Sequence, residues 1–145
     1  MKKNLYIINI TKNLNNIRKM EKIIRKQIGK ESHVFVITGN DFHELILNSK
    51  KLSFDDLKTC GLCGSDDLEL TAHVTEKRKH KYTCVRCKNR ACRACLNLGQ
   101  KIDDSNVVYF RTIETGEKDK NGKPIKKYDW RTAEQQKLDL DNDND

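Results

Sequence analysis

The chain has 145 residues, of which 36% are hydrophobic and 34% charged, and 29 lysines and arginines against 21 acidic residues give it a net charge of +8. This length suits one domain or two very small ones, which excludes enzyme barrels and nucleotide-binding domains of Rossmann size. The apolar run near the N-terminus is too short for a signal peptide or for the roughly 20 residues of a membrane-spanning helix. We therefore expect a cytoplasmic protein with no membrane partner, whose six cysteines are metal ligands rather than disulfides.

The first residues predict a strand followed by a helix. Residues 5–10 form a β-rich apolar run, which is typical of a strand. The segment after Asn13 is amphipathic and predicts a helix over residues 14–28, with Gly29 placed to end it. The apolar residues at helical spacing in this segment are Leu14, Ile17, Ile24 and Ile28.

A second strand and a second helix follow. Residues 33–38 predict the strand. Asp41, with Glu44 three residues later, predicts an N-cap and a capping box for a short helix that ends near Asn48. Residues 1–52 therefore predict a small α/β layer in the order β-α-β-α.

Two strands are marginal as a sheet, so we expect a later strand to complete this layer. The candidates within residues 103–131 are the runs 107–113 and 125–130, which have an Asn-Gly turn signal between them. The last residues, 132–145, are acidic and predict a disordered tail. Such a tail competes with nucleic acid for basic side chains, contacts a basic partner, or only improves solubility.

Two Cys-x-x-Cys pairs predict a zinc site. Cys60 and Cys63 form the first pair, and after twenty residues Cys84 and Cys87 form the second. Two such pairs supply the four thiolates of a tetrahedral site. Zinc in such a site is structural, because no coordination position stays open for water or substrate.

The residues between the two pairs predict a β-hairpin, with strands over 68–74 and 79–83 and a turn over 75–78. This layout resembles a zinc ribbon over residues 58–100. The resemblance implies an α+β protein in which a zinc ribbon is inserted between the N-terminal layer and the returning C-terminal strands.

A third pair, Cys92 and Cys95, leaves the ligand set open. In one alternative the first two pairs bind the metal, and these two cysteines are small buried side chains. In another, Cys92 replaces Cys84 or Cys87 as a ligand. In the third, a second zinc ion is bound. The ligands of that second ion would be Cys92, Cys95, His73 and His80.

The positive charge is concentrated around the cysteines. Residues 77–102 carry nine basic and no acidic side chains, and Tyr82 stands among them. This pattern is typical of contact with phosphate and with stacked bases, and it predicts binding of single-stranded or structured DNA. The residues expected to contact nucleic acid are Arg78, Lys79, Lys81, Tyr82, Arg86, Lys88, Arg90 and Arg93.

The order of motifs after the third pair carries a second resemblance. Residues 96–100 (LNLGQ) are followed by an aromatic-arginine run at 107–111, then by Gly122 and Trp130. Over residues 60–131 this order is similar to small phage- and prophage-encoded zinc-ribbon proteins. The resemblance implies an accessory role in replication, recombination or transcription in the cytoplasm of a host cell.

Two alternatives stand beside nucleic-acid binding. The first is a protein-interaction module that docks on a host replication or transcription enzyme and regulates it. The second is a degenerate nuclease of the His-Asn-His kind, since the Cys-x-x-Cys pairs, His73 and Asn89 resemble the zinc-supported form of that motif, although Ala72 replaces its acidic residue. We expect no enzymatic activity.

Overall fold

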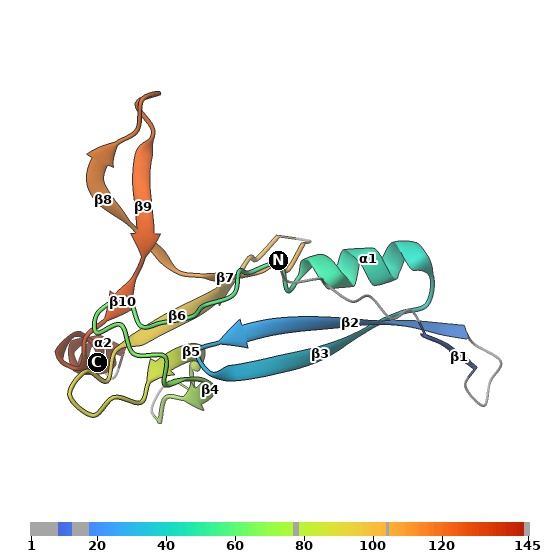
Figure 1. Ribbon diagram of the computed structural model, residues 1–145, viewed down its shortest axis with the longest axis horizontal. Helices are drawn as coiled ribbons and strands as arrows, with labels where there is room; N and C mark the ends of the chain where they lie inside the picture. Colours follow the sequence, from blue (N-terminus) through green and yellow to red (C-terminus); the bar gives the residue numbers. More distant parts are fainter. Residues whose placement is uncertain (1–8, 13–17, 77–78, 104, 144–145) are drawn as a thin grey trace. The chain divides into compact units, whose positions relative to one another are not determined.

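The computed structural model describes residues 9–12, 18–76, 79–103 and 105–143 (Figure 1). These residues form an α+β structure made mostly of strands, which confirms the predicted class, and their two helices are both too short and too polar to cross a membrane. The chain divides into two compact units. The first contains the described residues of 1–27, 32–56 and 100–109, and the second those of 28–31, 57–99 and 110–145.

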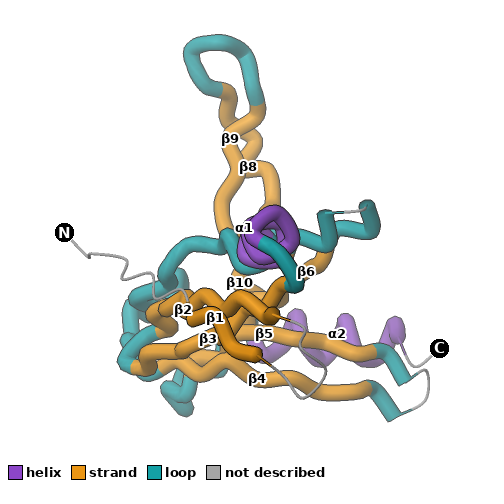
Figure 2. The backbone as a smooth tube through the Cα atoms, turned by 90° about the vertical axis from the view of Figure 1, so that its right-hand side faces the viewer, coloured by secondary structure: helices purple, strands orange, loops and turns teal. Residues whose placement is uncertain are grey.

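Three strands lie side by side in the N-terminal part of the described chain (Figure 2). They are β1 (Asn9–Lys12), β2 (Arg18–Ile28) and β3 (Glu31–Gly39), in that order across the sheet. Gly29 and Lys30 form the turn between β2 and β3. Gly29 has a φ of +58°, a conformation that glycine adopts without steric cost.

The helix predicted over residues 14–28 is wrong where the structure describes that segment, because β2 occupies it. Ile24 and Ile28 are four residues apart, and this spacing places two residues on one face of a strand as well as of a helix. Ile28 is fully buried in the strand. The turn at Gly29 therefore joins two strands instead of ending a helix. The parts of these predictions that fall on residues 5–8 and 14–17 lie outside the described residues.

The second predicted strand and its helix are confirmed. The strand predicted over residues 33–38 lies within β3, where half-buried and exposed side chains alternate. α1 (Phe42–Lys50) begins after Asp41, whose carboxylate accepts a 2.8 Å hydrogen bond from the backbone N–H of Glu44. Leu45 of α1 is fully buried in the first unit.

The second unit is built around a sheet with the strand order β10-β6-β5-β4, in which β7 also pairs with β6. The hairpin predicted between the cysteine pairs forms its β4–β5 ladder, with Leu68 opposite Cys87 and Val74 opposite Lys81. The strands are β4 (Leu68–Val74), β5 (Lys81–Cys87), β6 (Cys95–Gln100), β7 (Val108–Phe110) and β10 (Trp130–Arg131).

The two faces of this sheet differ in character. Val85 is paired with Leu96, and Leu68, which is paired with Cys87, lies on the same face; Leu68, Val85 and Leu96 are all almost fully buried. The opposite face carries Tyr82 and Arg86 of β5, because side chains alternate between the faces along a strand. One face is thus a hydrophobic core, and the other presents polar and aromatic groups.

The C-terminal strands do not complete the N-terminal sheet in the described chain. β7 and β10 both pair with β6, and β8 (Thr112–Lys118) pairs with β9 (Pro124–Tyr128) in a separate hairpin. Asn121 and Gly122 lie in the turn of this hairpin, as predicted. Figure 1 shows the hairpin standing away from the other strands of its unit. The prediction of a completed layer was wrong because strand propensity locates a strand without specifying its partner.

The tail predicted as disordered over residues 132–145 contains a helix, α2 (Ala133–Asp143). Thr132 and Gln135 form a reciprocal cap: the Thr132 N–H donates to Oε1 of Gln135, and the Gln135 N–H donates to Oγ1 of Thr132. Gln136 Nε2 donates to the carbonyl of Arg93, which ties α2 to its own unit. The prediction of disorder was wrong for residues 133–143 because it used the acidic composition of the segment, which does not reveal these contacts. Residues 144 and 145 lie outside the described part.

Candidate metal centre

Four cysteine sulfurs converge in the second unit. The Sγ atoms of Cys60, Cys63, Cys87 and Cys92 all lie within 4.8 Å of one another. Cys60 and Cys92 are 3.7 Å apart, and Cys63 and Cys87 are 3.5 Å apart. A tetrahedral ion with metal–sulfur bonds of about 2.3 Å places its sulfurs about 3.8 Å apart, so the spacing fits one ion of this kind.

The first two sulfurs are held by a tight turn. The Gly64 N–H donates to the carbonyl of Cys60, and the Cys60 N–H donates to the carbonyl of Ser65. Gly64 has a φ of +75°, a backbone conformation that would be strained for a residue with a side chain. The Leu62 N–H points at the Cys60 sulfur at 3.4 Å. Backbone donors of this kind stabilise thiolates, so the turn prepares this pair for a cation.

The other two sulfurs lie at the end of β5 and in the loop that follows it. The Cys87 N–H donates to the carbonyl of Ala94, and the N–H groups of Cys92 and Arg93 both donate to the carbonyl of Asn89. This loop folds back so that Cys92 lies beside Cys60. Four residues separate Cys87 from Cys92, which is within the spacing seen between ligands of zinc sites.

Cys84 lies outside this group, so the structure assembles the second of the three predicted ligand sets, with Cys92 in place of Cys84. The reason is the geometry of a strand. Cys84 and Cys87 both belong to β5 and are three residues apart, which places their side chains on opposite faces of the sheet. The sequence signal that could have shown this is the strand pattern of residues 81–87, because that strand contains both cysteines.

Cys95 also lies outside the group, and it is hydrogen-bonded to Cys84 on the opposite face of the sheet. This hydrogen bond lowers the pKa of Cys84 to about 7 and raises the pKa of Cys95. Among the described residues, His73 and His80 do not join these cysteines in a second cluster of potential ligands. The predicted second zinc site is therefore not assembled there.

Cys63, Cys87 and Cys92 differ in the pKa of their thiols. The backbone N–H of Ser65 stabilises the Cys63 thiolate and lowers the pKa of Cys63 to about 6. Burial raises the pKa of Cys87 to about 12, and burial also raises the pKa of Cys92. A metal ion entering at neutral pH would displace protons from these last two thiols.

No protein-family model, no curated protein and no solved structure matches the chain. The residues of the chain and their geometry are the basis for assigning a function.

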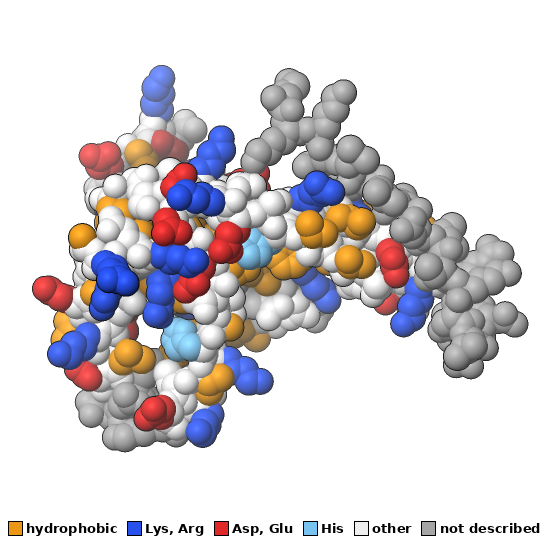
Figure 3. Space-filling view, turned by 60° about the horizontal axis from the view of Figure 1, so that its bottom comes forward, with side chains coloured by type: hydrophobic (Ala, Val, Ile, Leu, Met, Phe, Trp, Pro, Cys, Tyr) orange, Lys and Arg blue, Asp and Glu red, His pale blue; other side chains and the backbone are white. Residues whose placement is uncertain are grey.

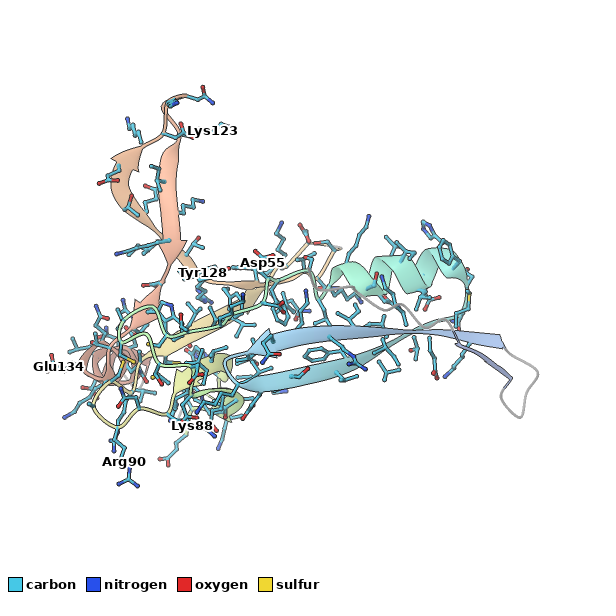
Figure 4. The ribbon with its side chains drawn as sticks, in the orientation of Figure 1. Asp55, Lys88, Arg90, Lys123, Tyr128 and Glu134 are labelled. Atoms are coloured by element: carbon cyan, nitrogen blue, oxygen red, sulfur yellow. The ribbon has the colours of Figure 1, made fainter. Side chains whose placement is uncertain are left out.

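The predicted nucleic-acid contacts are spread along β5 and the segments that flank it, and they do not form one uniform patch: Lys81 begins the strand and Cys87 of the cysteine cluster ends it. Tyr82 and Arg86 lie on one face of β5 and Lys81 on the other. Arg90 extends away from the ribbon in Figure 4. On the face seen in Figure 3, lysines and arginines stand among acidic side chains. The exposed basic residues of the predicted set are Lys79, Lys81, Arg86, Lys88, Arg90 and Arg93.

Three members of the predicted set have other contacts, and the first of these is a hydrogen bond from the Arg86 side chain to Cys84. Lys88 Nζ lies 3.9 Å from the carboxylate of Glu31 and 3.8 Å from that of Glu69. Tyr82 is half-buried and stacks on His73, with ring centroids 5.3 Å apart. Arg78 lies outside the described residues.

Proposed function

We propose that the four clustered cysteines hold one structural zinc ion and that the protein binds nucleic acid, with single-stranded or structured DNA as its ligand. Four thiolates are a preferred zinc donor set, and they leave no position open for catalysis. The metal would fix the loop that carries Arg90 and Arg93. The resemblance of the motifs in residues 60–131 to those of phage zinc-ribbon proteins supports an accessory role in replication, recombination or transcription.

The observation that carries the proposal is the set of exposed cations in β5 and in the segments that flank it at its two ends. Residues 77–102 contain no acidic side chain, so their charges are not cancelled within the segment. Lys79, Lys81 and Arg90 are exposed, and no ion pair joins them to the described residues. Free cations of this kind attract phosphate and release counterions when it binds.

The test compares two charge-reversal variants of the zinc-loaded protein. The first changes Lys79, Lys81 and Arg90 to Glu. The matched control changes Lys19, Arg25 and Lys50 to Glu; these residues are also exposed, and the net charge changes by the same amount. Binding to fluorescent single- and double-stranded oligonucleotides is measured at ~50 and ~200 mM salt, where each lost phosphate contact makes the log–log slope shallower by about 0.7 for single strands.

We expect the first variant to lose affinity and salt dependence together, while the control keeps a slope close to that of the unmodified protein. Equal losses in both variants would show that only net charge matters. No binding by the unmodified protein at ~50 mM salt, where phosphate contacts are strongest, would reject the proposal.

A protein-docking function remains a second candidate because of one feature of the first unit. Val34 and Val36 of β3 are 54% and 58% exposed, respectively, and lie on the same face of the strand. Adjacent exposed valines are a typical contact for another protein. Changing both to Thr keeps the strand propensity, so loss of a stoichiometric complex with a host enzyme, without loss of oligonucleotide binding, would identify this surface as the docking site.

A further inference from the structure

A pocket of about 510 Å³ lies over the polar face of the second unit's sheet, away from the four-cysteine cluster. Residues from β4, β5, β6 and α2 line it, together with Arg111 before β8 and Asp129 before β10. Its size is within the range of about 300–1,000 Å³ that small-molecule sites occupy. The proposed nucleic-acid surface does not explain this pocket, since Arg86 and Tyr82 are the only members of its described part that line the pocket.

Three arginines line the pocket, and only one of them has a carboxylate partner. Arg131 donates two hydrogen bonds to Asp139, at 3.1 and 3.0 Å, and lies 3.8 Å from Asp129. These contacts satisfy both acidic groups of the lining. Arg86 and Arg111 are exposed and form no ion pair with the described residues. Arg111 is therefore available for an anion, and Arg86, whose side chain also hydrogen-bonds to the sulfur of Cys84, adds a second guanidinium with further N–H donors.

An aromatic pair lies in the same lining. His73 and Tyr82 stand opposite each other on β4 and β5, and their rings are stacked at an angle of 22°. Nδ1 of His73 is buried and has no hydrogen-bond partner within the described chain. The lining thus offers flat rings and an unused polar atom beside the two arginines.

We propose that this pocket binds one nucleotide, with its phosphate on Arg86 and Arg111 and its base against the His73–Tyr82 pair. Guanidinium groups bind phosphate oxygens in a bidentate geometry, and aromatic rings stack on any base. The proposal rests on the proposed function, which it deepens: the nucleotide is either free or one unit of a bound single strand. Cys87 of the four-cysteine cluster lies on the opposite face of β5 from Tyr82 and Arg86.

The test uses the full-length, zinc-loaded protein and three probes, which are dTMP, inorganic phosphate and a ten-residue oligothymidylate. Arg111→Gln removes one phosphate contact, and His73→Leu removes the stacked ring. Arg25→Gln is the matched control, because this arginine is exposed, does not line the pocket and is not among the proposed nucleic-acid contacts. Thermal melting of each variant verifies that it folds.

We expect dTMP to bind more tightly than phosphate. Arg111→Gln should weaken dTMP binding by about tenfold, as loss of a charged hydrogen bond does, and Arg25→Gln should leave dTMP binding unchanged. His73→Leu should reduce the preference for dTMP over phosphate. Weakening of the oligothymidylate by Arg111→Gln would place the nucleotide within a strand, and an effect on dTMP alone would make it a free nucleotide.

Three results would overturn the proposal. They are failure of dTMP to bind, equal affinity for dTMP and phosphate, and no effect of Arg111→Gln. If oligonucleotides still bind in a manner that depends on Lys79, Lys81 and Arg90, the proposed function survives without the pocket. If dTMP binds as expected but no oligonucleotide binds, the pocket survives and the proposed function fails.

Discussion

The guanidinium of Arg131, at the end of β10, donates hydrogen bonds from Nε and Nη2 to the two carboxylate oxygens of Asp139 on α2. The contact joins residues eight positions apart and raises the pKa of Arg131. An acidic, polar sequence of this kind would not hold a helix by propensity alone. The pair, with the Thr132–Gln135 cap, explains why α2 is ordered against its unit.

Asp139→Asn should loosen α2 without unfolding the protein. The variant removes the charge but keeps the size, and a partly exposed bidentate pair contributes about 1 kcal/mol. Amide hydrogen exchange in α2 should therefore speed up by about fivefold. Asp141→Asn is the control, since Asp141 is exposed on the same helix and has no described ion pair. Equal exchange rates in the two variants would contradict this role for Arg131.

Gly61→Ala should destabilise the second unit through Trp130. A Cβ at Gly61 would lie 2.5 Å from Nε1 of the indole, so the ring must shift. Overpacking of this kind costs about 1–3 kcal/mol of unfolding free energy, measured by denaturant titration. In a Trp130→Ala background the same substitution should cost little, and additive effects of the two changes would rule out the contact as the cause.

Metal loading should release protons and become tighter as the pH rises. In the metal-free protein at pH 7, Cys87 and Cys92 hold their protons, because their pKa values are raised, whereas Cys63, with a pKa of about 6, is already a thiolate. Each ion should therefore displace at least two protons, and its affinity should rise by about a hundredfold per pH unit near neutrality. Calorimetric titration in buffers of different ionisation enthalpy counts the protons. An affinity independent of pH would contradict these assignments.

The sequence predicted parts of the structure that depend on short-range chemistry. Asp41 caps α1, and the Asn121–Gly122 turn closes the β8–β9 hairpin. Prediction from the sequence failed where one spacing of apolar residues fits both a helix and a strand. The spacing between Ile24 and Ile28 fits a helix and a strand equally, and the β2–β3 turn at Gly29 decides between them.

The ligand set shows the same limit at the candidate site. The Cys-x-x-Cys spacing indicates thiolates, but it does not state whether both residues lie on a turn. Cys84 lies inside β5, so it points away from Cys87, and Cys92 takes its place from the next loop. This exchange of Cys84 for Cys92 depends on the pairing of β5 with β6. The partner of a strand cannot be read from the spacing of residues within it.

The most direct test of the metal centre is the metal content of two cysteine variants, measured by elemental analysis after purification under reducing conditions. We predict that Cys84→Ser retains about one zinc ion per chain, whereas Cys92→Ser loses most of its zinc and unfolds in the second unit, since the thiolate cluster is closed only by Cys92. Loss of zinc from Cys84→Ser together with full retention by Cys92→Ser would contradict the four-cysteine centre on which the proposed function is built.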